Sequence, residues 1–215
     1  MFARLGEPLV KRRSGFEAQR MPRQYGVTMS TFVRARASSG SAPVAVILPG
    51  AGYTAMGPLL YWCGEMLSQE GWHVQGVEWT VDARALSDPR AFVEQSVAEA
   101  FDAAPQSSRR LIVAKSFGCF ALPWARRNGI PGVWLTPVLT NEDVRLALIE
   151  ASAADMAVGG DADAVWLPEA IADTGANVIS VPRADHSLAI PGDWLGSLTA
   201  QRAIFESIAN HLRTT

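Results

Sequence analysis

The sequence predicts an α/β fold: a three-layer sandwich in which helices cover both faces of a mostly parallel sheet. Short runs of β-branched residues alternate with longer segments of helical periodicity, which is the order that a parallel sheet with crossover helices produces. Residues 44–48 are apolar at every position, as expected for a central strand buried on both faces. No repeat or low-complexity linker interrupts this order.

The predicted elements are recognised by their periodicity, which is two residues in edge strands and close to four in helices. In chain order they are one or two antiparallel edge strands over 25–37, a strand over 44–48, a helix over 59–70, a strand over 73–79, a helix over 89–103, a strand over 111–113, a helix over 119–127, a strand over 132–135, a helix over 141–151, strands over 156–158 and 178–181, and a helix over 194–212. Gly71 is a typical end for the first helix, and Asn141 is a typical N-cap for the fourth.

Size and charge predict one domain over residues 25–215, preceded by an N-terminal arm over residues 1–24. The 215 residues are 48% hydrophobic, which is enough for one substantial core. With 19 Lys and Arg against 21 Asp and Glu, the chain has no basic field, so nucleic acid is not expected as a partner. No stretch approaches the ~20 apolar residues that span a bilayer, so no membrane association is expected either.

The two cysteines and the start of the chain favour a cytoplasmic protein. Cys63 and Cys119 fall in predicted helices and fit no metal-binding or redox spacing, so we expect them reduced and buried. No apolar signal core follows Met1. We expect no metal site at these cysteines.

Ser116 is the candidate nucleophile, because it lies between a buried strand and a helix in the segment Ala114-Lys115-Ser116-Phe117-Gly118. A chain that reverses sharply at this point holds the serine in a strained turn with its hydroxyl exposed, and such a turn requires small neighbours. Ala114 and Gly118 meet that requirement. The alternative is that Ser116 only caps the helix that follows.

His186 is the candidate base, since it follows the last strand in a polar loop from which an imidazole could reach the serine. His73 opens a strand and His211 lies on the last helix, so both are poorly placed. An acid could come from Asp161 or Asp163, which share a loop after the strand over 156–158. That loop could equally be an Asp/Gly-rich surface turn.

An oxyanion needs two backbone N–H donors near the nucleophile. The amide of Phe117 supplies the first, and the loop after the strand over 44–48 supplies the second. Within that loop Gly52 and Tyr53 are the candidates, with Tyr53 preferred.

Together these segments resemble the α/β-hydrolases, especially small members without a cap. The resemblance rests on Leu48-Pro49-Gly50-Ala51-Gly52, Ala114-Lys115-Ser116-Phe117-Gly118, Gly160-Asp161-Ala162-Asp163 and Asp185-His186-Ser187-Leu188. It implies hydrolysis of an acyl bond, most simply a carboxylic ester of a small molecule, through an acyl-enzyme and without a cofactor. Two departures are Ala114 in place of the usual glycine and the lack of a histidine before the oxyanion loop.

The resemblance also assigns roles. Its G-x-x-D turn aligns Gly160 with Asp163, which makes Asp163 the first choice for the orienting acid and Asp161 the second. The short connection after Leu139 leaves no room for a cap, so the site should be open. Trp79 and Trp166 are candidates to line an acyl pocket, although each could instead pack in the core or at its rim.

Two other functions compete with the hydrolase. The segment from Gly50 to Ala55 fits the G-x-G-x-x-G/A pattern of a dinucleotide-binding oxidoreductase, and Glu78 lies where a ribose-binding acid would sit. Pro49 argues against it, because it interrupts the direct passage from strand to first glycine. A non-enzymatic binding protein on the same fold is the third hypothesis.

Overall fold

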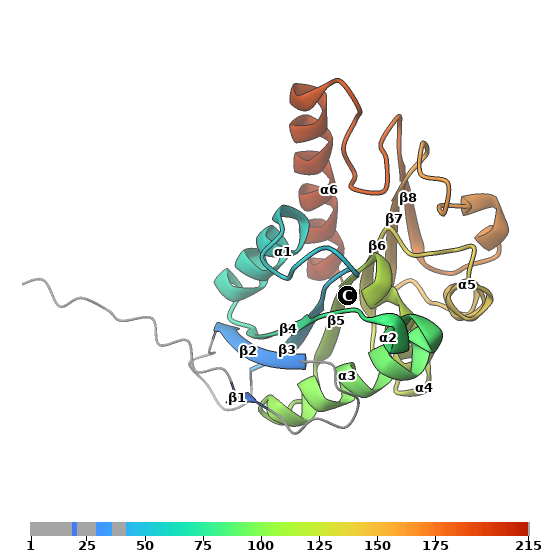
Figure 1. Cartoon of the computed structure of the whole chain (residues 1–215). Helices are drawn as coiled ribbons and strands as arrows, with labels where there is room; N and C mark the ends of the chain where they lie inside the picture. The colour runs from blue at the N-terminus through green and yellow to red at the C-terminus, as the bar shows by residue number, and fades with distance from the viewer. Residues whose placement is uncertain (1–18, 21–28, 36–41, 215) are drawn as a thin grey trace, which may run out of the picture.

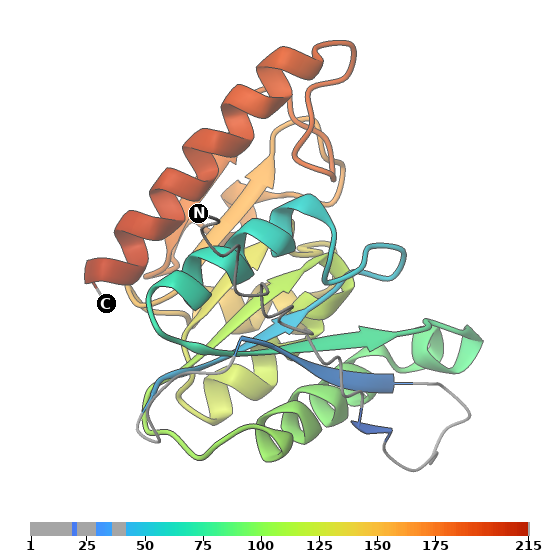
Figure 2. The same cartoon turned by 90° about the vertical axis from the view of Figure 1, so that its left-hand side faces the viewer.

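The computed structural model describes residues 19–20, 29–35 and 42–214. Apart from a two-residue strand, the arm predicted over residues 1–24 lies outside these residues, as does part of the edge-strand region predicted over 25–37. Figures 1 and 2 show a twisted sheet between two layers of helices, which confirms the predicted three-layer architecture.

In the described part of the chain the sheet has eight strands in the order β1-β2-β4-β3-β5-β6-β7-β8. The first two pair antiparallel at one edge, and the strands from β4 to β8 run parallel. The strands are β1 (Gln19–Arg20), β2 (Met29–Ala35), β3 (Val44–Leu48), β4 (His73–Trp79), β5 (Arg110–Lys115), β6 (Gly132–Leu135), β7 (Met156–Gly160) and β8 (Asn177–Val181). The helices are α1 (Pro58–Gln69), α2 (Ala83–Ser87), α3 (Pro89–Ala103), α4 (Leu122–Arg127), α5 (Glu142–Ile149) and α6 (Trp194–Thr214), with 3-10 helices η1 (Ser116–Ala121) and η2 (Pro168–Ile171).

The two faces of the sheet are covered by different helices. Helices α1 and α6 pack on one face, and α3, α4 and α5 on the other. Alternate residues of β3 point to opposite faces, so that Ala45 and Ile47 join the α1/α6 side while Val46 and Leu48 join the α3–α5 side. This double burial explains the continuous apolar run in the sequence.

Three short helical elements were not predicted. Helix α2 is a single turn capped by Asp82, whose carboxylate accepts bonds from two backbone amides. The segment predicted as one helix over 119–127 is instead η1 followed by α4, and Pro123 lies near the start of α4. The third is η2, which precedes β8. Between β6 and α5 the chain has only residues 136–141, which leaves no cap domain there.

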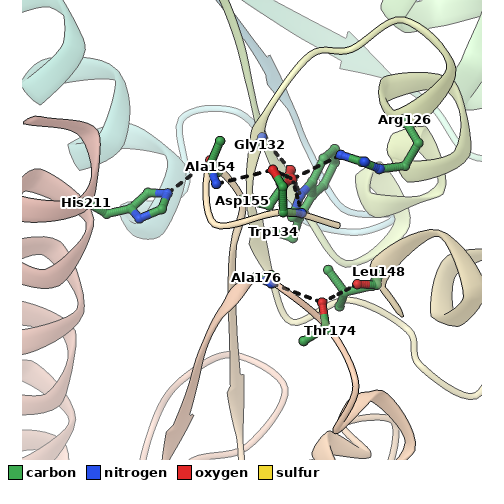
Figure 3. A network of polar contacts seen from close by, with 10 residues as sticks. Arg126, Gly132, Trp134, Leu148, Ala154, Asp155, Thr174, Ala176 and His211 are labelled. Atoms are coloured by element: carbon green, nitrogen blue, oxygen red, sulfur yellow. Dashed lines mark hydrogen bonds and ion pairs between the residues drawn. The ribbon is translucent and has the colours of Figure 1, made fainter. Parts of the chain in front are cut away.

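At the amino ends of β6 and β7 a buried carboxylate joins several segments, as Figure 3 shows. Asp155 Oδ1 accepts hydrogen bonds from Gly132 N at 3.0 Å and from Trp134 Nε1 at 3.2 Å. Its Oδ2 accepts from Ser152 N at 3.1 Å and lies 3.3 Å from a guanidinium nitrogen of Arg126. This network fixes the end of the sheet opposite to the candidate site.

Candidate active site

The carboxyl ends of β3, β5, β7 and β8 lie together, and we call this end of the sheet the carboxyl edge. Strand β5 ends at Lys115, and η1 begins at the next residue, Ser116, whose φ is 51°. A non-glycine residue in this left-handed region is strained, as expected for a serine at a sharp strand-to-helix turn. A Cβ at Gly118 would lie 2.7 Å from the carbonyl oxygen of Leu48, so the turn requires glycine at that position.

His186 comes to the serine from the loop between β8 and α6. Its Nε2 lies 2.7 Å from Ser116 Oγ, and its Nδ1 lies 2.6 Å from Asp163 Oδ2. A single neutral tautomer satisfies both contacts, with Nδ1–H donating to the carboxylate and Nε2 accepting from the hydroxyl. The loop is shaped by Asp185, whose Oδ1 accepts from the amides of Ser187 and Ala189.

The two candidate acids occupy different environments. Asp163 is buried, and its Oδ1 accepts from Val165 N at 3.1 Å while its Oδ2 faces the imidazole. Asp161 is exposed and accepts a hydrogen bond from the backbone N–H of Arg183. The structure therefore brings Asp163 to His186 and uses Asp161 to stabilise the turn after β8.

Gly160 explains how the loop of His186 can lie so close to the end of β7. A Cβ at this position would stand 2.0 Å from the carbonyl oxygen of Ala184. Because that contact is with backbone, no side-chain movement could relieve it. The amide of Ala162 also donates to the same carbonyl at 3.0 Å, so β7 and the histidine loop are joined directly.

The loop after β3 lies beside the serine. A Cβ built on Gly50 would be 3.6 Å from Ser116 Cβ, which shows how closely the two backbones approach. Tyr53 is fixed by its hydroxyl, which accepts from Leu59 N at 2.8 Å in the first turn of α1. Gly52 is exposed, with open space around it. Phe117 lies in the first turn of η1, where a backbone amide has no acceptor within the helix.

The two tryptophans predicted as pocket candidates are placed differently. Trp79 donates from Nε1 to the carbonyl of Gly50 at 3.1 Å and makes edge contacts with Phe92 and Phe117, so it supports the loop and the first turn of η1. Trp166 is only 4% exposed, packs over Gly159 and donates to Ser180 Oγ. Its position is that of a core residue.

Lys115 has no role predicted from the sequence, yet it is buried next to Ser116. Burial lowers the pKa of this lysine, because the ammonium loses its water. A signal was present in the sequence, since a lysine at the end of an otherwise apolar strand is unusual.

The loop that resembles a dinucleotide-binding motif does not lead directly into a helix. Helix α1 begins only at Pro58, after an extended Gly57, so the pattern from Gly50 to Ala55 lies wholly in the loop. A pyrophosphate site needs the helix to begin at the motif, because the first-turn amides bind the phosphates. Within the described residues no group of three or more side chains of the metal-binding types is found, and no helix there is long and apolar enough to cross a bilayer.

No family model matches the sequence, and no curated protein sequence is similar to it. Solved structures are similar in fold. Mouse α/β-hydrolase domain-containing protein 10 has a TM-score of 0.67 and 11% identity, covering 92% of this chain and 99% of that one. An α/β serine hydrolase homologue from Coxiella burnetii has a TM-score of 0.65 and 13% identity, covering 91% and 97%. An α/β serine hydrolase without a lid from Xanthomonas campestris has a TM-score of 0.60 and 13% identity, covering 97% of each chain. With its sheet order, its lack of a cap and these structural relatives, the chain has the α/β-hydrolase fold.

Proposed function

We propose that the protein is a serine hydrolase that cleaves a carboxylic ester of a small molecule through an acyl-enzyme on Ser116. One observation carries this proposal: His186 Nε2 lies 2.7 Å from Ser116 Oγ while Asp163 holds the other ring nitrogen. An imidazole placed in this way can take the hydroxyl proton as the oxygen attacks, and the carboxylate stabilises the imidazolium that forms.

In the proposed mechanism Ser116 Oγ adds to the ester carbonyl and His186 Nε2 accepts its proton. The amide of Phe117 and an amide of the loop after β3, with Tyr53 preferred to Gly52, stabilise the negative oxygen. The ester C–O bond then breaks, His186 gives its proton to the leaving alcohol, and the acyl group stays on Ser116. Water then attacks the acyl-enzyme while His186 accepts its proton. His186 returns that proton to Ser116 Oγ as the carboxylic acid leaves.

Ser116→Ala tests the proposal. We expect the variant to lose hydrolysis of a short p-nitrophenyl ester and labelling by a fluorophosphonate, while its thermal unfolding stays cooperative. Ser207→Ala is the matched control, because Ser207 lies on α6, where its hydroxyl donates to the backbone carbonyl of Ala203. Mass spectrometry of the labelled wild type should locate the adduct on Ser116. Labelling that persists in Ser116→Ala would overturn the proposal.

A further inference from the structure

Lys115 is a buried cation at the point where several loops of the carboxyl edge meet. It is the last residue of β5, immediately before Ser116, and only 3% of its surface is exposed. It follows Leu111 and Val113 at alternate positions, so its side chain points to the α1/α6 face of the sheet. The chain has only two lysines, Lys11 and Lys115, among 19 basic residues.

The ammonium of Lys115 contacts three different loops. It donates to the backbone carbonyl of His186 at 3.1 Å and to Thr136 Oγ1 at 3.3 Å. It also lies 4.9 Å from the centre of the Tyr53 ring, within the range of a cation–π interaction. Residue 136 follows β6, residue 186 follows β8 and residue 53 follows β3. One side chain therefore connects the end of β5 to the loops that follow β3, β6 and β8.

Keeping this cation buried is unfavourable in itself. Burial lowers the pKa of Lys115, and the negative charges of Asp163 and Asp185 offset only part of that effect. An aliphatic side chain of similar size would avoid the loss of hydration. We therefore expect the interactions of the ammonium, rather than the packing of the aliphatic chain, to account for a lysine at this position.

Two features of the loop that carries His186 indicate that it needs an additional contact to hold its conformation. His186 is flanked by Arg183 and Leu188, which both have positive φ, at 61° and 54°. The imidazole side chain is 39% exposed, so its own burial does little to fix it. Backbone strain on both sides favours other loop conformations unless the surrounding contacts hold the observed one.

We propose that Lys115 is a positioning residue: its ammonium fixes the backbone carbonyl of His186 to the end of β5 and so keeps the imidazole on Ser116. The proposal rests on the proposed function, in which Ser116 is the nucleophile and His186 the base. Lys115 precedes the nucleophile directly, so one residue sets the position of the serine backbone and of the base at the same time.

Lys115→Met is the first test, because methionine keeps an unbranched apolar side chain and removes all three donors. We expect the second-order rate of fluorophosphonate labelling and kcat to fall about 10- to 100-fold, the range for a misplaced reactive group, with KM within about twofold. Lys115→Gln keeps a neutral N–H donor and should lose less. Thr136→Val is the matched control, since it removes the other acceptor but leaves the bond to His186.

A spectroscopic measurement separates positioning from general destabilisation. The Nδ1–H proton of His186, which bonds to Asp163, should give a far-downfield NMR signal in the wild type. In Lys115→Met we expect this signal to broaden through exchange at a temperature where circular dichroism shows the protein folded. A merely structural lysine would lower the unfolding temperature and leave the signal of the folded protein unchanged.

Each outcome distinguishes the two proposals. If the wild type is not labelled at Ser116, the proposed function fails. If the wild type is labelled and folded Lys115→Met reacts within twofold of it, only the role of Lys115 is overturned. If Lys115→Met does not fold, Lys115→Gln decides: a reduced labelling rate with a broadened His186 signal supports the role, and wild-type values for both overturn it.

Discussion

Two buried aspartates lie at opposite ends of the same parallel sheet, and their partners differ in kind. Asp155, at the amino ends of β6 and β7, receives bonds from backbone amides, an indole N–H and an arginine, which keep their protons at neutral pH. Asp163, at the carboxyl edge, shares one oxygen with a histidine that can gain and lose a proton. Burial alone therefore does not make a carboxylate functional, and the partner decides what it can do.

Among the variants that test this comparison, Asp163→Asn should have the largest effect. The amide would keep the shape of the side chain but could favour the wrong imidazole tautomer, so kcat/KM for a short ester should fall about 10³- to 10⁴-fold. The melting temperature should change little. Asp161→Asn is the matched control, because Asp161 contacts the backbone of Arg183, and its kcat/KM should stay within a few-fold of the wild type. A larger loss in the Asp161 variant would reverse the assignment of the acid.

Asp155→Ala should lower stability and leave activity nearly unchanged, the reverse of what we expect for Asp163→Asn. It leaves Gly132 N and Trp134 Nε1 without their acceptor and Arg126 without its counter-charge, which should lower the free energy of unfolding by about 3–5 kcal/mol. Urea unfolding measures this loss. The kcat per active site, counted by fluorophosphonate titration of the folded protein, should stay within twofold. A selective loss of kcat would show that the amino end of the sheet also controls the site.

The smallest effect is expected for Trp79, which supports the loop after β3 by donating to the carbonyl of Gly50. Trp79→Phe keeps an aromatic ring beside Phe92 and Phe117 but removes the N–H that donates to Gly50, so stability should fall by about 1 kcal/mol. We expect kcat to fall by a few-fold as the loop loosens. Trp124→Phe, on α4, is the control, since Trp124 stacks on Phe101. Equal kcat values for the two variants would contradict a role of Trp79 in the site.

The layered fold could be predicted because the central strands β3 and β5 have continuous apolar runs and the longer crossover helices have their own periodicity. Helix α2 could not, since a single turn has too few residues for periodicity and depends on its cap at Asp82. The split of η1 from α4 had a signal in the sequence, since Pro123 is favourable in the first turn of a helix and unfavourable inside one.

The candidate site was predictable to the extent that its residues follow strands directly. Ser116 and His186 were placed by the order of strands and loops. The choice of Asp163 over Asp161 came only from the resemblance, because both residues lie in one loop and their orientation depends on the turn geometry around Gly160. Trp166 lies in the loop after β7, and its hydrogen bond to Ser180 on β8 is a contact that no local pattern identifies. The same holds for the contacts of Lys115.

Four non-glycine residues of the described chain have positive φ: Ser116, Thr136, Arg183 and Leu188. Three of them follow the carboxyl ends of strands directly or within two residues, and the fourth stands two residues after His186. Each such conformation costs of the order of 1 kcal/mol or more. Selection of random variants for heat resistance alone would thus favour glycine or asparagine at these positions and drive the protein toward a more robust but less reactive molecule.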